Sequence, residues 1–222
     1  MMFVTLRAAS DDRVRQAFLL LQQIRRLDPR VDPTVEELAR VEKGMLFVSL
    51  YACIEFTLTG AVSQFLTELQ NAPGLPAAYH PALLTVLLNR EFNAVVDASK
   101  RTIWKNKALL IERIFGRDAC TIDPAVFPAD GTNISSEHFE SIWKHLQLPG
   151  PPLPQGVQTW LVDEIKNHRN AIAHGREKAA NIGSRFSVAT LESRFRAVQT
   201  ICEHTILSFE DHLAKKSFLV RP

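Results

Sequence analysis

The sequence predicts an all-α fold, a helical bundle built as a single domain of residues 1–222. Apolar residues recur at helical spacing over several long segments, and no internal repeat or convincing strand pattern interrupts them. Nine glycines in 222 residues are few, which argues against a turn-rich all-β protein. The hydrophobic content of 46% with 23% charged residues is ordinary for a globular chain of this length, which can bury a substantial core.

The helices follow from the apolar periodicity and from the breaks between the periodic segments. We expect them at residues 11–27, about 34–69, about 82–115, 135–146, about 157–174 and about 187–216. Residues 41–69 should form the central helix, with the helix of residues 157–174 packed on it. Residues 89–93 are a possible joint in the 82–115 segment. An irregular insertion is expected at about 116–134, and a Pro/Gly linker at 148–156.

Residues 44–62 are apolar enough to raise the question of a membrane span. Glu55 lies near the centre of this segment, where an unpaired carboxylate would be costly in a bilayer. We therefore expect a buried central helix and no membrane partner. The first residues lack the features of a signal peptide, and three widely spaced cysteines favour reduced thiols. Both observations predict a cytoplasmic protein.

The formal net charge of +2 gives no global field that would draw the protein onto nucleic acid, so any RNA contact needs a local basic patch. One such cluster combines basic and aromatic side chains. Its members are Lys100, Arg101, Lys105, Lys107, Arg113, Trp104 and Phe115. It is either an RNA-tracking surface or a solvated helix face, and the second is the more common explanation.

The segment KNHRNAIAHGRE, residues 166–177, is the one place where polar residues look selected for chemistry. On a regular helix Arg169 lies about 40° from the apolar position Ile165, and His174 lies about 140° from Arg169. Gly175 predicts that the helix ends here, because glycine readily takes the left-handed cap conformation. Two side chains so far apart cannot easily hold one phosphate. Either the helix distorts, or a second copy of the same helix completes the site.

The run Arg169-Asn170-x-x-x-His174 resembles the R-N-x(3)-H form of the Rx(4–6)H motif of the HEPN superfamily. The wider RNAIAHG is similar to the RNxIAHG run of bacterial HEPN families of the MAE type. In these families a long, apolar second helix also carries a polar residue at its middle, as Tyr51 and Glu55 do here. The resemblance implies a HEPN-like bundle and a metal-independent endoribonuclease that acts as a dimer.

The resemblance also assigns roles to individual residues. The catalytic set is Arg169, His174 and Asn170, the supporting set is Glu55 and Tyr51, and the RNA-binding set is Lys166, Arg176 and Lys178. These roles agree with the chemistry of the side chains, because histidine exchanges protons near neutral pH and arginine holds phosphate. The implied substrate is RNA, cut with its own 2′-hydroxyl as nucleophile and without metal or cofactor.

Similar bacterial HEPN proteins are toxins or anti-phage effectors that act in dimers. The resemblance therefore implies a homodimer, or a pair with a related helical partner, and a cognate inhibitor that restrains it. The alternative is a non-catalytic RNA- or protein-binding module, in which Arg169 pairs with an acidic residue and His174 only caps its helix. Glu55 either orients Arg169 or is satisfied by Arg, Lys or Tyr51.

Other chemistries have little support in the sequence. His168 and His174 are six residues apart, unlike the zinc-binding H-E-x-x-H pair, and paired cysteines are missing. His168 is better explained as a packed histidine. The chain contains no Walker loop, no GxGxxG and no GxSxG, so nucleotide hydrolysis, dinucleotide binding and esterase chemistry are not indicated.

Overall fold

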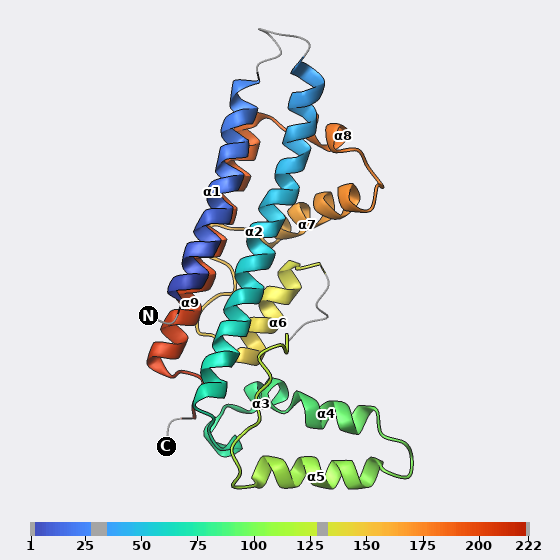
Figure 1. The fold of residues 1–222 in the computed structure, drawn as a ribbon, viewed down its shortest axis with the longest axis vertical. Coiled ribbons are helices and arrows are strands. Elements are labelled where there is room, and N and C mark those ends of the chain that lie inside the picture. Colours follow the sequence, from blue (N-terminus) through green and yellow to red (C-terminus); the bar gives the residue numbers. More distant parts are fainter. Residues whose placement is uncertain (1–2, 28–34, 128–132, 221–222) are drawn as a thin grey trace.

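The computed structural model describes residues 3–27, 35–127 and 133–220, and every regular element in these ranges is a helix. Three long helices lie side by side: α1 (Val4–Arg26), α2 (Glu36–Asn71) and α9 (Val188–Lys215) (Figure 1). Within the described ranges the one β-type contact is an isolated bridge between Tyr79 and Leu219. The predicted all-α class is confirmed.

Helix α2 is the centre of the bundle. It contacts α1, α9, α7 (Thr159–Ala173) and the short α8 (Ala179–Gly183). Its apolar residues point in all directions, and Leu46, Leu58 and Phe65 are completely buried, as expected of a core helix. The prediction of a central helix with the motif helix packed on it is confirmed. The predicted start near residue 34 lies outside the described residues.

Helix α2 is also long and apolar enough to cross a membrane, by length and composition alone. Buried positions make up 56% of its most apolar window, which is the pattern of a core helix covered by its neighbours. A single helix of this kind is therefore weak support for a membrane span.

Two glycines allow α2 and α8 to touch. A Cβ atom on Gly44 would collide with the backbone carbonyl of Ala179, and one on Gly183 would collide with the carbonyl of Arg40. Only residues without side chains permit so close an approach of two backbones. The pair fixes the chain just after the motif helix, because α8 begins five residues after His174, at Ala179. The sequence did not predict α8.

The prediction of one helical segment at residues 82–115 was wrong in its continuity. It is divided into α3 (Pro81–Leu87), α4 (Asn89–Val96) and α5 (Ile103–Phe115). The first break, at Leu88, adjoins the possible joint predicted at 89–93. The sequence did not predict the second break. There the Ser99 carbonyl accepts hydrogen bonds from the Thr102 and Ile103 amides, and the chain turns back between α4 and α5. Figure 1 shows these helices as an arm that projects from one end of the molecule, next to the 3-10 turn η2 (Pro76–Ala78).

The remaining elements agree with the sequence more closely. Helix α6 (Ser136–Leu146) begins with a capping box formed by Ser135 and His138, and α9 begins at the Ser187 cap. Helix α1 starts seven residues earlier than predicted, because Phe3 is buried and faces the Phe209 ring at 6.5 Å. The 148–156 segment has no helix. The described parts of the insertion, 116–127 and 133–134, are irregular.

Candidate functional site

Helix α7 carries the motif and is fixed at three sides. The helix contacts α2 and buries Leu161 and Ile165, while Glu164 accepts two hydrogen bonds from Arg194 of α9, at 2.6 and 3.2 Å. The Asp163 carboxylate caps α6 by accepting from the Ser136 amide and hydroxyl, at 3.2 and 2.8 Å. A carboxylate at a helix N-terminus is favourable, so α6 and α7 hold each other in place.

The C-terminal end of α7 lies where Gly175 predicted it. The helix ends at Ala173 with His174 as its cap, and Gly175 has a φ of +64°, the left-handed conformation. The Gly175 amide donates to the Ile172 carbonyl at 3.0 Å, which satisfies one of the last carbonyls of the helix. His174 therefore sits on a defined turn at the surface.

The Arg169 side chain has three partners. One Nη donates to the Asn170 Oδ1 at 2.8 Å and to the Asn133 Oδ1 at 2.9 Å. The guanidinium carbon lies 4.6 Å from the centre of the Tyr51 ring, a cation–π contact. The other two guanidinium nitrogens have no hydrogen-bond partner among the described residues. Arg169 is thus held in one orientation and keeps donors for an anion.

Tyr51 connects this arginine to the core. Its hydroxyl accepts from the Ile134 amide at 2.7 Å and donates to the Glu55 Oε1 at 3.2 Å. Burial, and then the Glu55 carboxylate, raise the pKa of Tyr51 to about 12, so the hydroxyl stays protonated and remains a donor. Of the two interpretations of Glu55, the structure shows the one in which its carboxylate accepts a hydrogen bond from Tyr51. Glu55 reaches Arg169 only through Tyr51.

Asn133 is a site residue that sequence reasoning missed. It is the next-to-last residue of the insertion of about 116–134, whose role the sequence did not indicate, and its φ of +47° is left-handed. Asparagine tolerates this conformation better than most residues, which was the one available signal. The neighbouring Ile134 binds Tyr51, so the end of the insertion lies against the motif helix.

The His174 side chain does not take part in the contacts that hold Arg169. It is exposed, and within the described ranges no hydrogen bond or ion pair joins it to Arg169. Helix α7 is α-helical through Ala173, so the two side chains leave it about 140° apart, as the spacing predicts. Of the two alternatives, a distorted helix is therefore excluded for the described chain, and one copy alone does not bring Arg169 and His174 together.

The three basic residues predicted to bind RNA differ in their surroundings. The Lys166 ammonium lies 3.6 Å from the Asp163 carboxylate, with which it forms an ion pair. Arg176 and Lys178 are exposed and have no charged partner in the part of the chain that the structure describes. His168 packs between the rings of Phe47 and Phe186, at 4.8 and 5.3 Å, and burial lowers its pKa. It is the packed histidine that the sequence indicated.

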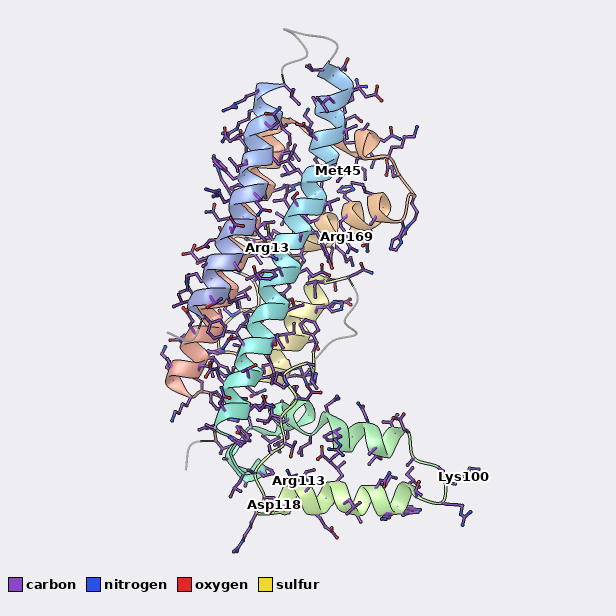
Figure 2. All side chains as sticks on the ribbon, viewed as in Figure 1. Arg13, Met45, Lys100, Arg113, Asp118 and Arg169 are labelled. Atoms are coloured by element: carbon purple, nitrogen blue, oxygen red, sulfur yellow. The ribbon has the colours of Figure 1, made fainter. Side chains whose placement is uncertain are left out.

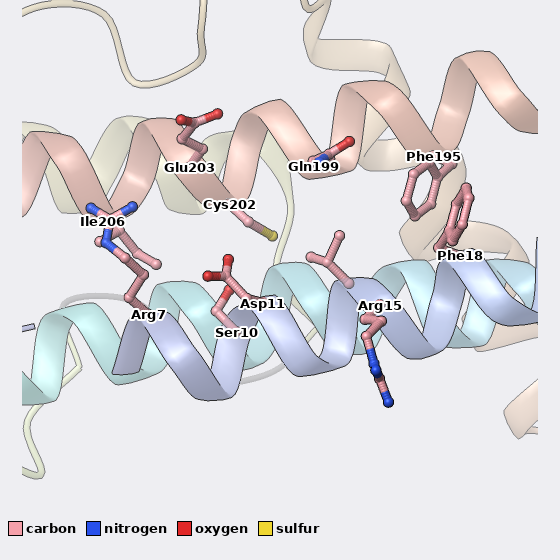
Figure 3. A pocket seen from close by; sticks show the side chains of 11 residues that line it. Arg7, Ser10, Asp11, Arg15, Phe18, Phe195, Gln199, Cys202, Glu203 and Ile206 are labelled. Carbon is pink, nitrogen blue, oxygen red and sulfur yellow. The ribbon is translucent and has the colours of Figure 1, made fainter. Parts of the chain in front are cut away.

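The structure contains one cavity beside the site and another away from it. One, of about 270 Å³, adjoins the tyrosine network and is lined by Glu55, Thr59 and residues 124–127 among others. Another, of about 540 Å³, lies between α1 and α9, away from the motif (Figure 3). The rings of Phe18 and Phe195 lie tilted against each other at one end of it, with their centres 5.6 Å apart. Burial raises the pKa of its Cys202 thiol to about 11, so that thiol is not a ready nucleophile.

Comparison with family models, with characterised proteins and with solved structures finds no match for this chain. The functional assignment therefore depends on the RNxxxH run and on the contacts that surround it. Among the described residues, three or more His, Cys, Asp or Glu side chains never gather into a group that could hold a metal ion.

Proposed function

We propose that this protein is a metal-independent endoribonuclease of HEPN type that cuts RNA with Arg169 and His174. The observation that carries the proposal is the preorganised Arg169 side chain, at the start of a motif that ends in exposed His174. A cation already held in place costs no reorganisation when charge develops on a phosphate. Asn170 is one of the groups that hold it.

The proposed reaction needs only these side chains and the RNA. The 2′-hydroxyl loses its proton to a His174 imidazole and attacks the adjacent phosphorus, while Arg169 stabilises the phosphoryl oxygens. The bond to the 5′-oxygen of the next nucleotide then breaks, and that oxygen takes a proton from a second imidazole or from water. The products are a 2′,3′-cyclic phosphate end and a 5′-hydroxyl end.

The active unit is proposed to be a homodimer, because Arg169 and His174 diverge on α7. A second copy of α7 placed around a two-fold axis would supply the missing partner of each residue. Arg176 and Lys178 would then contact the RNA backbone, and Tyr51 and Glu55 would position Arg169. A related helical protein is the alternative second subunit.

The biological role that follows is a toxin or anti-phage effector in the cytoplasm, restrained by a cognate inhibitor. This part of the proposal rests on the resemblance of RNAIAHG to bacterial HEPN proteins. The test is expression in a bacterial host, wild type beside His174→Ala. Growth arrest with fragmented total RNA in the wild type only is the expected result. Equal growth with intact RNA in both strains would contradict the proposal, provided that the expressed protein is soluble and that no host inhibitor is bound to it.

A second candidate is a non-catalytic binding module. It is favoured by the engagement of Arg169 with Asn133 and Asn170, which is also what a structural arginine would show. Purified proteins separate the two functions. Arg169→Ala and His174→Ala should each abolish cleavage without loss of helicity, and cleavage should persist in EDTA. His145→Ala, which changes a half-buried histidine on α6, is the matched control. A module would show no cleavage in any of the four proteins.

A further inference from the structure

Helices α4 and α5, the projecting part of the arm, contribute little to the core, whereas α3 buries Leu83, Val86 and Leu87. Helix α4 has no buried residue and α5 has only Leu110, although both helices are well formed. The hydrogen bond from the Asn106 side chain to the Ala94 carbonyl, 2.7 Å long, ties them together. Figure 2 shows Lys100 at the far end of the arm, which extends from the same side of α2 as Arg169. Because α4 and α5 bury so few residues, most of their surface is accessible to a ligand.

The far end of this arm, residues 96–107, is hereafter the arm tip, and it concentrates positive charge. Four exposed cations occupy it, Lys100, Arg101, Lys105 and Lys107, against one carboxylate, Asp97. The tip therefore carries +3 in a chain whose net charge is +2, which leaves the rest of the molecule at −1. In the described structure none of the four cations has an ion-pair partner, whereas Arg113 lies 3.7 Å from Asp118 and 3.9 Å from Glu91.

An aromatic side chain stands among these cations. Trp104 is 75% exposed, which is unusual for so large an apolar residue. The Lys107 ammonium lies 4.6 Å from the centre of its ring, so one part of the indole is covered by a cation and the rest is open. An exposed indole in a cation-rich segment is the combination with which proteins stack a base and hold its phosphates.

We propose that the arm tip is an RNA-binding surface separate from the motif, at which single-stranded RNA lays phosphates on the four cations and stacks a base on Trp104. The choice of RNA as the ligand rests on the proposed function. The arm then holds a substrate strand and raises its local concentration near α7, which a chain of nearly neutral net charge cannot do through its overall field.

Two other ligands fit parts of this surface less well. An anionic bilayer would contact the whole exposed apolar side of α5, which continues from Trp104 to Ile111 and Phe115. However, the Glu112 carboxylate lies beside that side, and the cations are gathered at the tip. An apolar protein partner would likewise use Phe115, which is 80% exposed. RNA binding depends on Trp104 and the cations and is indifferent to Phe115.

The test is RNA binding measured by fluorescence anisotropy, with the full chain carrying His174→Ala so that the probe is not cut. The probe is a fluorescein-labelled oligouridine of about 20 nucleotides, longer than the site of a typical single-strand-binding module. Trp104→Ala should weaken binding about 5- to 150-fold, the range found for loss of one stacked base. Phe115→Ala, on the same helix, should leave it unchanged.

Replacing the four cations by alanine should weaken binding by about 10-fold or more and reduce the salt slope by about 2 to 3. Replacing Arg15 and Arg196, two exposed cations on α1 and α9, is the control for loss of positive charge elsewhere and should have little effect. Circular dichroism checks that each variant folds. Binding unchanged by the tip variants, or absent from the parent protein, would overturn the inference.

The remaining outcomes separate this inference from the proposed function. Equal losses for Trp104→Ala and Phe115→Ala would replace base stacking by a general apolar contact, and sedimentation with vesicles of phosphatidylserine and phosphatidylcholine would then show whether lipid is the ligand. RNA binding at the tip without cleavage by the wild type would uphold the inference and refute the nuclease. If the tip variants cleave long RNA as well as the wild type does, the nuclease proposal would stand and the inference about the tip would be overturned.

Discussion

The Arg169 guanidinium rests on the Tyr51 ring, 4.6 Å from its centre, so a cation of the motif helix is seated on the central helix of the bundle. The Tyr51 hydroxyl is in turn fixed by the Ile134 amide and Glu55. Any shift of Tyr51 would therefore change the orientation of Arg169. The stability of the core and the geometry of the candidate site are coupled at this one aromatic side chain.

Tyr51→Phe separates the two roles of this side chain. The ring that supports Arg169 stays, but the buried Ile134 amide loses its acceptor, so the free energy of unfolding should fall by about 1 to 3 kcal/mol. Urea denaturation measures the change. Glu55→Gln keeps an acceptor for the Tyr51 hydroxyl and should cost less. If Tyr51→Phe is as stable as the wild type, the Ile134 hydrogen bond does not have the importance assigned to it.

The parts of the site that lie close together in sequence could be predicted, and those joined across the chain could not. Gly175 predicted the end of α7 because a left-handed cap needs a particular residue. The divergence of Arg169 and His174 followed from helix geometry alone. Asn133 lies 36 residues before Arg169, and no local pattern links an irregular segment to a helix so far away.

The errors in the fold have a similar origin. The 97–102 turn interrupts a stretch whose apolar residues keep helical spacing on both sides, so periodicity extended one helix through it. The early start of α1 depends on burial of Phe3 against α9, a tertiary contact. Helix α8 has five residues, too few to show a period, and its position depends on a glycine contact with α2.

That glycine contact predicts a large difference between similar substitutions. Gly183→Ala should destabilise the protein by about 3 kcal/mol or more, because the new methyl group would meet the rigid Arg40 carbonyl. Gly60→Ala, on the same central helix as Gly44, would meet only the end of the flexible Leu6 side chain, at 2.5 Å, and should cost far less. Thermal unfolding compares them. Equal melting temperatures for the two variants would refute the close α2–α8 contact.

The buried His212 predicts how stability depends on pH. Burial lowers its pKa from 6.5 to about 4, its Nε2 lies 2.9 Å from the Leu146 carbonyl oxygen, and its ring stacks on Phe65. Between these two pKa values the unfolded chain binds a proton that the folded chain does not. The contribution of His212 to the free energy of unfolding is therefore complete above about pH 6.5, and up to about 3 kcal/mol of it is lost as the pH falls to 4.

Urea denaturation at a series of pH values measures this loss. His212→Gln keeps a donor for the Leu146 carbonyl but does not titrate, so its stability should change less between pH 6.5 and 4. His145→Gln, at a half-buried histidine of α6, serves as the control and should keep the wild-type dependence. A His212→Gln variant with the full wild-type loss would assign the effect to other groups, of which the packed His168 is the first to test.

The divergence of Arg169 and His174 on α7 makes the strongest prediction about assembly. If the site forms between two copies, a mixture of two inactive proteins should regain activity. Arg169→Ala keeps His174 and His174→Ala keeps Arg169, so a mixed dimer contains one complete Arg/His set contributed by two chains. The proteins are unfolded together in urea and refolded together, and RNA cleavage is then measured against each variant refolded alone.

Cleavage by the mixture only, with light scattering that shows a dimer, is the expected result. The control mixture pairs Arg169→Ala with the double variant Arg169→Ala/His174→Ala, which contains no Arg169 in any dimer and should stay inactive. If each chain instead held its own complete site, both mixtures would be inactive while the wild type cleaved RNA. That result would require His174 to move to the Arg169 side of α7, against the regular helix that separates them by about 140°.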